Sequence, residues 1–568
     1  MNWTLFSAFV SVFIATTNIQ FALAQNEKPL SVSPKKKPNI LLIMADDVGT
    51  GDIEGWWKDS SSLVHMPNIN KLIRLGVKFT DAHSSSLCAP SRYMLLSGNY
   101  QHRGKAPKGS WDMSESGNQF LSHQQSIAQF LKDENYSTFM SGKWHLGTKA
   151  MENFNYTNIL SGNDWSNNSL IQGPGDIGFD TSFISLGGIQ APPYSFFKND
   201  QLVLSEAQGI KFWKKGSYQK SNGISKIHMN EGEGDVEWDS SQYNIRIIKE
   251  TISYIDEHLE QKENKPFFAY VALGSVHTPH TPPIKYVDGS NVANEYQTRH
   301  LDMLYEMDKS VGALVDAIEN RNIEEETIII FTSDNGGLRH SEKFSHQTSG
   351  PLRGEKASIY EGGHRVPLVF RFENVFPSGE SRDKLVGLND VYSTIADLVG
   401  TNPIPHGSAQ DSISFAEYLS SAENDDGLRK TFSHWEYRRG KETIHATRNG
   451  DMKLIHFPRN GTHSLYNLKD DISESNDISG DPQYNDLIKV MYNQLMADGP
   501  CPDADKAHGK SFELFNHFYK TKQKQLCTWF KEKRQRCKKY IEGSLYCGKT
   551  CKRKGWCQRH YTNSSQIN

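Results

Sequence analysis

The stretch that decides the fold is Pro38–Gly49, which reads PNILLIMADDVG. It begins with a continuous apolar run and ends with two carboxylates, Asp46 and Asp47, close to a glycine. An apolar run of this length is typical of a strand buried on both faces, as in a parallel sheet. We therefore expect a buried strand that ends at the two carboxylates.

The same order of an apolar run and then polar residues recurs along the chain. It is found at Tyr136–Met140 before Ser141–His145, at Pro266–Leu273 before Gly274–His277, and at Glu326–Ser333 before Asp334–Gly337. Stretches with helical periodicity, such as Ser126–Lys132 and Tyr305–Asn320, lie between these runs. This alternation predicts an α/β fold with a large, mostly parallel sheet flanked by helices, and ligands bind beyond the carboxyl ends of such strands.

Composition and the N-terminus indicate an exported globular protein. The chain has 568 residues, of which 36% are hydrophobic, and its net charge of -3 argues against a general nucleic-acid binder. Residues 1–24 have an apolar middle and a small-x-small end, which predicts a signal peptide, and no later stretch is long and apolar enough to span a membrane. We expect a location in the secretory pathway, either secreted or in a lysosome-like compartment. Five sequons agree with export and predict glycosylation at Asn135, Asn155, Asn167, Asn460 and Asn563.

Cysteine positions divide the chain unequally. Six of the seven cysteines lie near the C-terminus and are expected to form disulfides in an oxidising compartment: Cys501, Cys527, Cys537, Cys547, Cys551 and Cys557. Six cysteines allow about 15 pairings. Cys88 is the seventh cysteine and has no partner in this count. The alternatives for it are a buried free thiol, an intermolecular disulfide and a reactive group. The segment from Cys501 onward is basic, with 16 Lys and Arg against 5 Asp and Glu.

A change in composition near residue 400 marks a second unit. Asn402–Ser412 is rich in Pro, Gly and Ser, and the strand-like segments Glu442–Arg448 and Met452–Phe457 follow. We read these segments as a smaller C-terminal antiparallel-sheet subdomain. The predicted organisation is a signal peptide at 1–24, a main α/β domain at 36–400, the smaller subdomain at 401–495 and a cysteine-rich module at 501–557.

The predicted strand ends carry an oxygen-rich set of side chains: Asp46, Asp47, Asp334 and Asn335. Hard cations such as Ca²⁺ or Mg²⁺ take such ligands, whereas zinc attracts His or Cys. Asp, Asn and Gly are also common in ordinary turns, which is the alternative for each pair alone. Two apolar strands that end in this way in one sheet favour a metal site.

Cationic or titratable side chains are predicted near the same edge: Arg92, Lys143, His145, His277 and Lys356. Together with a metal they would form a pocket for a tetrahedral anionic centre, although any one of them alone could simply pair with a carboxylate. The sequence Pro90–Arg92 indicates a helix start, and a helix N-terminus suits an anion. Cys88 would then lie just before such a site.

These motifs resemble the type I, formylglycine-dependent sulfatases of the alkaline-phosphatase-like superfamily. The signature Cys-x-Pro-Ser-Arg-x-x-x-Leu-x-Gly is matched at Cys88–Gly98. Other matches follow in family order: Asp46-Asp47-x-Gly, Gly142–Gly147, His277–Pro279, Ser333–Gly336, Lys356–Pro367 and Ser464–Asp471. The resemblance covers about Pro38 to Asp477. It implies an alkaline-phosphatase-like fold and a sulfatase catalytic domain in residues 36–400.

The resemblance also implies a mechanism. A formylglycine-generating enzyme would oxidise Cys88 to formylglycine, and one hydroxyl of the hydrated aldehyde would attack sulfur. One Ca²⁺ ion would be bound by Asp46, Asp47, Asp334, Asn335 and the modified residue 88. Arg92 and His145 would stabilise the hydrate, with His145 as the base. Lys143 and Lys356 would bind sulfate oxygens, and His277 or Lys356 would protonate the leaving oxygen.

The expected activity is hydrolysis of sulfate esters of the arylsulfatase type, with sulfated carbohydrates among the candidate substrates. Two alternatives are a phosphoester or phosphonate hydrolase of the same superfamily, and a non-catalytic protein that binds sulfated carbohydrates and keeps Cys88 unconverted. A cysteine protease would not explain the clustered carboxylates. The residues leave the natural substrate and the oligomeric state open.

The C-terminal cysteines resemble a different family, the six-cysteine ShKT module. That resemblance implies the pairs Cys501–Cys557, Cys527–Cys547 and Cys537–Cys551, whereas a zinc site is the alternative that export disfavours. One hypothesis is that this basic module docks on acidic sulfated polymers, and the alternative is a solvated basic face.

Overall fold

Strand β1 (Asn39–Ala45) is fully buried near the centre of a ten-stranded sheet. The computed structural model describes residues 36–498, except for 59–62, 106–116, 151–169, 208, 214–217, 222–223, 229, 231, 262–264, 339–345, 401–402, 406 and 439–441. The predicted signal peptide, the C-terminal cysteines and the sequons at Asn155, Asn167 and Asn563 lie outside the described residues.

The middle of the sheet is parallel. The order β15 (Thr327–Ser333), β1, β14 (Phe267–Ala272), β4 (Ser137–Lys143) and β7 (Thr181–Ser185) runs in one direction throughout. Antiparallel pairing begins on one side with β16 (Leu368–Arg371), beyond which lie β2 (Val77–Phe79) and β17 (Glu380–Arg382). It begins on the other side with β8 (Phe196–Lys198), followed by β9 (Gln201–Val203). The predicted large, mostly parallel sheet is confirmed, and the four predicted strands are immediate neighbours.

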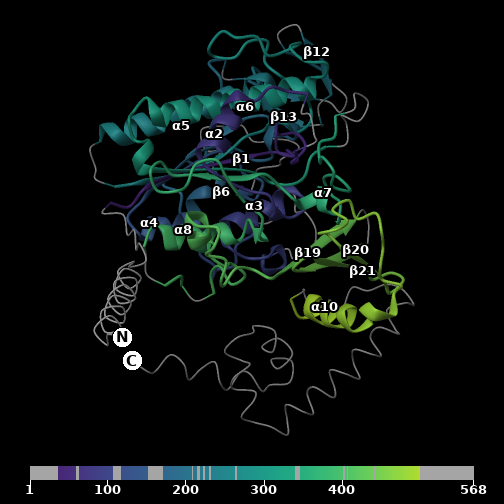
Figure 1. Ribbon diagram of the computed structural model, residues 1–568. Helices are drawn as coiled ribbons and strands as arrows, with labels where there is room; N and C mark the ends of the chain where they lie inside the picture. The colour runs from purple at the N-terminus through teal and green to yellow at the C-terminus, as the bar shows by residue number, and fades with distance from the viewer. Residues whose placement is uncertain are drawn as a thin grey trace, which may run out of the picture.

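Alternate residues of β1 point into two separate hydrophobic cores. Ile40, Leu42 and Met44 pack with residues of α3 (Cys88–Ser97), α4 (Ile127–Asp133) and α8 (Asp390–Leu398). Leu41, Ile43 and Ala45 pack with residues of α2 (Pro67–Leu75), α5 (Tyr243–Glu260) and α6 (Arg299–Glu319). Figure 1 shows these two groups of helices on opposite sides of the sheet. The unbroken apolar run is explained by this two-sided burial.

Two predicted helices differ from the structure at their starts. Helix α6 begins at Arg299 rather than at Tyr305, because the side chain of Thr298 accepts the N–H of Leu301 and caps the helix. Helix α3 begins at Cys88 rather than at Pro90, with Leu87 as its N-cap residue. Cys88 is therefore the first residue of a helix and not the residue before one.

A separate antiparallel sheet follows the main sheet along the chain. Its strands are β19 (Thr431–Arg438), β20 (Glu442–Asn449), β21 (Met452–Phe457) and β22 (Thr462–Asn467). Helix α10 (Asn485–Asp498) packs on this sheet through Met491, which meets Leu454 and Leu465 (Figure 1). The predicted small antiparallel sheet is confirmed, whereas the domain boundaries remain predictions.

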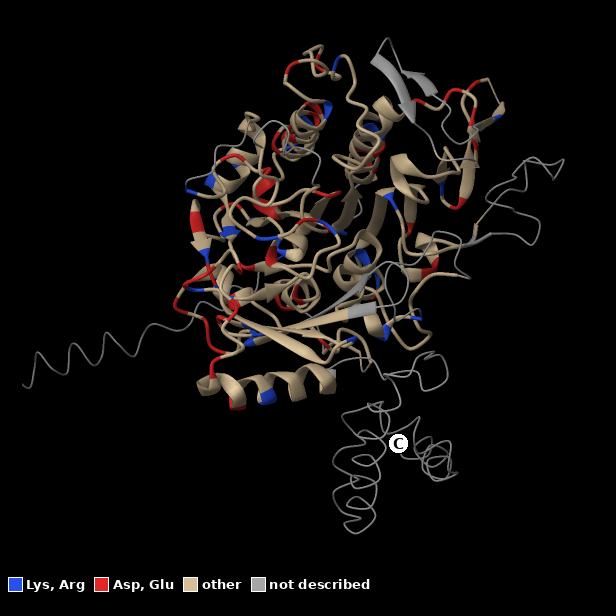
Figure 2. Ribbon diagram, turned by 90° about the vertical axis from the view of Figure 1, so that its right-hand side faces the viewer, with Lys and Arg blue, Asp and Glu red and all other residues tan. Residues whose placement is uncertain are grey.

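Several short strands and α-helices accompany these elements. They are the strand pairs β3 (Ala82–His83) with β18 (Val386–Gly387), β5 (Lys149–Ala150) with β6 (Leu170–Gln172), β10 (Ile210–Trp213) with β13 (Gly232–Asp235) and β11 (Tyr218–Ser221) with β12 (Ile224–His228), and the helices α7 (Glu361–His364) and α9 (Ala416–Ser420). Within the described ranges, none of the helices combines the length and apolar character that crossing a bilayer requires. Figure 2 shows acidic and basic residues intermixed along the described ribbon.

Candidate active site

The carboxyl ends of β1 and β15 bring the predicted oxygen ligands together. The two strands are in register from Asn39 with Thr327 to Ala45 with Ser333, so the residues that follow them meet at one edge. The backbone N–H of Asp47 donates to Asp334 Oδ1 at 3.1 Å, and Asn335 Nδ2 donates to Asp47 Oδ1 at 2.8 Å. Asp46, Asp47, Asp334 and Asn335 are all at most 1% exposed.

Each of the three carboxylates has a cationic partner. Lys143, at the end of β4, lies 2.7 Å from Asp46 Oδ2, and Lys356 Nζ lies 2.5 Å from Asp47 Oδ1. Arg92 of α3 lies 2.6 Å from Asp334 Oδ2 and donates to the carbonyl of Lys143. Buried carboxylates need such partners to remain charged.

Nearby cationic side chains lower the pKa values of Asp46 and Asp47. Burial by itself would raise the pKa of Asp46, but the charges of Lys143 and His277 hold it below its ordinary value. Burial acts in the same way on Asp47, whose pKa is lowered by Lys356 and His277. Both side chains are therefore carboxylates at neutral pH.

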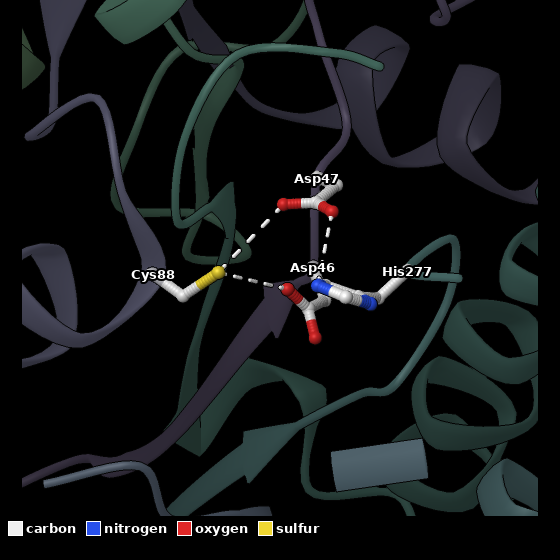
Figure 3. A group of neighbouring side chains, drawn as sticks. All are labelled: Asp46, Asp47, Cys88 and His277. Atoms are coloured by element: carbon white, nitrogen blue, oxygen red, sulfur yellow. Dashed lines mark hydrogen bonds and ion pairs between the residues drawn. The ribbon is translucent and has the colours of Figure 1, made fainter. Parts of the chain in front are cut away.

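Cys88 lies inside this group of charges. Its Sγ is 3.5 Å from Asp46 Oδ1 and 3.7 Å from Asp47 Oδ1 (Figure 3), and Lys356 Nζ is 3.2 Å from it. The first turn of α3 therefore brings the predicted nucleophile precursor to the predicted metal ligands. Burial, followed by the charge of Asp334, raises the pKa of the Cys88 thiol well above its ordinary value.

Two histidines border the group. His277 Nε2 lies 3.5 Å from Asp47 Oδ2 (Figure 3), and its Nδ1 is 2.7 Å from the carbonyl of Thr278. His145 follows β4, and no hydrogen-bond partner for its buried Nδ1 is found among the described residues. Burial and then the charges of Lys143 and Arg92 lower the pKa of His145 well below its ordinary value, so its imidazole is neutral. Burial also lowers the pKa of His277.

The donor set fits a hard cation. Asp47 Oδ2 and Asn335 Oδ1 are buried acceptors, and neither has a hydrogen-bond partner among the residues that the structure describes. Buried acceptors normally accept a hydrogen bond. Two such oxygens without one, in a group that contains three carboxylates, are suited to binding a cation. Because the donors are oxygens, they match Ca²⁺ or Mg²⁺ better than zinc.

The structure thus brings together all the residues predicted for metal binding and catalysis. The described sequons Asn135 and Asn460 both have exposed side chains. A different buried group, Asp52 with His300 and His346, did not come from the sequence analysis. Its members lie far apart in the sequence, and neither histidine follows a predicted strand.

Comparisons with known proteins find similarity to sulfatases. The Sulfatase family model matches residues 38–401, and a model described as N-sulphoglucosamine sulphohydrolase, C-terminal, matches residues 354–498. An N-acetylgalactosamine-6-O-sulfatase of Bacteroides thetaiotaomicron is 26% identical over 81% of this chain and 93% of its own. Arylsulfatase D of Homo sapiens is 26% identical over 74% of this chain and 75% of its own.

A solved structure from Bacteroides thetaiotaomicron, determined in work on glycosaminoglycan metabolism, has the same fold. Its TM-score is 0.67 at 24% identity, and the match covers 82% of this chain and 99% of the other.

Proposed function

This chain belongs to the sulfatase family and hydrolyses sulfate esters, and we propose that it does so with a formylglycine made from Cys88 and a bound calcium ion. The observation that carries the proposal is the position of Cys88. Its Sγ lies 3.5 Å from Asp46 Oδ1, 3.7 Å from Asp47 Oδ1 and 3.2 Å from Lys356 Nζ. A side chain at this point touches both the metal ligands and a lysine that can bind sulfate.

An unmodified cysteine is a poor nucleophile in this place. Thiols attack as thiolates, and burial together with the charge of Asp334 raises the pKa of Cys88, which disfavours the thiolate. A hydrated formylglycine would present hydroxyl groups at the same position. This difference supports conversion of Cys88 by a formylglycine-generating enzyme during maturation.

Asp46, Asp47, Asp334, Asn335 and the modified residue 88 would hold the calcium ion. The ion would supply positive charge that offsets the charge of the sulfate oxygens. Arg92 and Lys143 keep the carboxylates of Asp334 and Asp46 in fixed orientations through their short ion pairs. The chain therefore preorganises these ligands before substrate arrives.

The remaining groups would bind sulfate and move protons. Lys143 and Lys356 would bind sulfate oxygens as ammonium groups, and Arg92 would help to hold the hydrate. His145 would accept a proton as the base, which its lowered pKa supports because a base must be unprotonated. His277 or Lys356 would give a proton to the leaving oxygen.

We propose a sulfated carbohydrate as the substrate. The N-acetylgalactosamine-6-O-sulfatase relative, which covers 81% of this chain, supports a 6-O-sulfated amino sugar as the first compound to test. We further propose export through the secretory pathway. The exposed side chains of Asn135 and Asn460 support glycosylation there.

Mass spectrometry of the peptide that contains Cys88, from protein of the native source, tests the nucleophile. Formylglycine is the expected residue, and an intact thiol would contradict the proposed mechanism. Nitrophenyl sulfate and nitrophenyl phosphate, compared with the same preparation, test the ester type, and predominant phosphatase activity would favour the phosphoester alternative.

Sulfate release from a panel of substrates tests their class. The panel contains 6-O-sulfated N-acetylgalactosamine, an aryl sulfate and a steroid sulfate. The sugar should have the highest kcat/KM, and preference for either of the other two would contradict the proposed substrate class.

A further inference from the structure

A second cluster of metal-binding side chains lies beside the turn that carries Asp46 and Asp47. It consists of Asp52 in the loop after β1, His300 in the first turn of α6, and His346 in the segment before Lys356. We propose that these three residues bind a divalent transition-metal ion of the zinc class. This proposal is independent of the proposed function, because none of the three residues belongs to the site around Cys88.

The ligand atoms of the cluster converge on one point. His346 Nε2 lies 2.8 Å and His300 Nε2 3.3 Å from the same oxygen, Asp52 Oδ1. One ligand atom from each residue lies within 4.8 Å of the others. Ligands bound to zinc at about 2.0–2.1 Å in a tetrahedral arrangement are about 3.3 Å apart. A small movement of the side chains would therefore admit a zinc ion between them.

Burial and charge favour a cation at this place. The exposed fraction is 0% for Asp52, 3% for His300 and 2% for His346. Burial tends to raise the pKa of Asp52, but hydrogen bonds from the two histidines lower it below its ordinary value, so the buried side chain is a carboxylate. His300 Nδ1 is also buried, with no hydrogen-bond partner among the described residues. Two imidazoles and one carboxylate form a donor set that suits first-row transition metals.

Another buried group of similar residues is less suited to binding a cation. His83, Glu361 and His364 also lie close together. Lys453 lies 2.9 Å from Glu361 Oε1, and Arg448 lies 3.4 Å from Glu361 Oε2. Positive charge is therefore already present at that carboxylate. Asp52 Oδ1, by contrast, lies next to the imidazole nitrogens of His300 and His346, and imidazole is a common metal ligand.

A metal at Asp52 would act on the architecture of the active site. The second oxygen of Asp52 accepts the N–H of Gly49 at 2.8 Å, and the N–H of Gly51 donates to the carbonyl of Thr348 at 2.9 Å. The loop that begins with Asp46 and Asp47 is thus already packed on the segment that leads to Lys356. A bound metal would tie these two segments to α6, away from the reacting atoms.

Zinc binding by the full-length protein tests the proposal. The protein is treated with a chelator, returned to calcium-containing buffer and titrated with Zn²⁺ by calorimetry, with bound metals counted by mass spectrometry. We expect one zinc per chain in addition to calcium, and a higher Tm when zinc is present. Co²⁺ used in place of zinc should give the visible absorption of a four- or five-coordinate site, a result that needs no variant. Failure to bind zinc would mean that the three residues form a hydrogen-bonded triad only, and would overturn the proposal.

Three variants assign the zinc to its residues. His346→Gln and His300→Gln should each weaken zinc binding at least about tenfold, the lower end of what even outer-shell partners of a metal contribute. His277→Gln alters the histidine beside Cys88 and should retain zinc. His456→Gln is the matched control and should also retain zinc. His456 is a buried histidine, 5% exposed, in the small sheet. Unchanged affinity in His346→Gln, or loss of zinc in His277→Gln, would overturn the assignment.

Discussion

Two buried networks of charged side chains in this molecule have opposite uses. The first is the proposed active site around Cys88, called the active site below. The second, which we call the junction cluster, joins the main sheet to the small antiparallel sheet and contains Asp81, His83, Glu361, Arg448, Lys453 and Glu474. Lys453 lies 2.9 Å from Glu361 and 2.8 Å from Glu474, and Arg448 lies 3.2 Å from Asp81.

Both networks pair their carboxylates with lysine or arginine, so buried charge alone does not identify a catalytic site. The active site differs in two respects. It lies at the carboxyl ends of parallel strands, and it contains the thiol of Cys88, whose Sγ lies beside Asp46 and Asp47. The junction cluster lies between α7 and strands β20 and β21, where its ion pairs connect two parts of the fold. The comparison predicts that damage to the first network abolishes turnover, whereas damage to the second lowers stability.

Cys88→Ala should have the largest effect on activity. Loss of the proposed nucleophile precursor should lower kcat at least about a thousandfold, as removal of a nucleophile does in other hydrolases. The free energy of unfolding should change little, because alanine continues the first turn of α3. Sulfate release and thermal unfolding of the purified variant measure the two effects. A variant with normal turnover would refute the role of residue 88.

Lys453→Met should have the largest effect on stability. It leaves the buried carboxylates of Glu361 and Glu474 without their shared cation, and breaking a buried ion pair in this way costs about 3–5 kcal/mol. Denaturant unfolding measures the loss. Lys36→Met is the matched control, because the exposed pair of Lys36 with Glu326 contributes about 0–1 kcal/mol. Equal stability of the two variants would show that the junction cluster does not hold the two parts together.

Removal of the proposed calcium ion should affect the active site and leave the junction cluster intact. A chelator should abolish turnover and lower the free energy of unfolding by about 2.7 kcal/mol, if calcium had been present at about a hundred times its Kd. Added Ca²⁺ should restore both. Asp47→Asn, which weakens the ligand set, should show a smaller calcium-dependent shift in Tm. A Tm that changes neither with chelator nor with added calcium would contradict the predicted metal site.

Much of the active site was open to prediction because several of its parts follow strong local signals. The apolar run of β1 predicts a buried strand, and neighbouring parallel strands must place their ends together, so Asp46 and Asp334 could be expected to meet. The signature around Cys88 is recognised from the order of its residues, without knowledge of the fold. The geometry at Lys356 could not be derived, because it depends on how a distant segment packs against Asp47.

The junction cluster and the Asp52 group were not predicted, for a physical reason. Asp81 and Arg448 meet only because a separate sheet packs on the first one, and no periodicity in the sequence encodes that contact. His300 belongs to the polar first turn of α6, before the apolar repeat that identifies the helix. Such contacts arise from tertiary packing, which overrides the local pattern.

The dependence of stability on pH gives the smallest predicted effect and separates the networks further. Burial lowers the pKa of His83 in the junction cluster below its ordinary value, despite the nearby charge of Glu361. The folded chain has the lowered pKa and the unfolded chain the ordinary one. Between these two pKa values the unfolded chain binds the proton and the folded chain does not, so stability must rise with pH. The contribution of His83 is therefore complete above about pH 6.5 and is lost as the pH falls toward its folded pKa.

The Tm of the wild type, measured from pH 8 to pH 5, should fall more steeply below about pH 6.5 than the Tm of His83→Gln, which lacks this titration. The slope is compared rather than the absolute Tm, because glutamine also alters the hydrogen bonds to Asp81 and His364. Histidines that do not contact His83 contribute in the same way to both proteins and cancel in the difference. Identical slopes would mean that His83 takes up its proton as readily in the folded as in the unfolded chain, and would contradict the prediction.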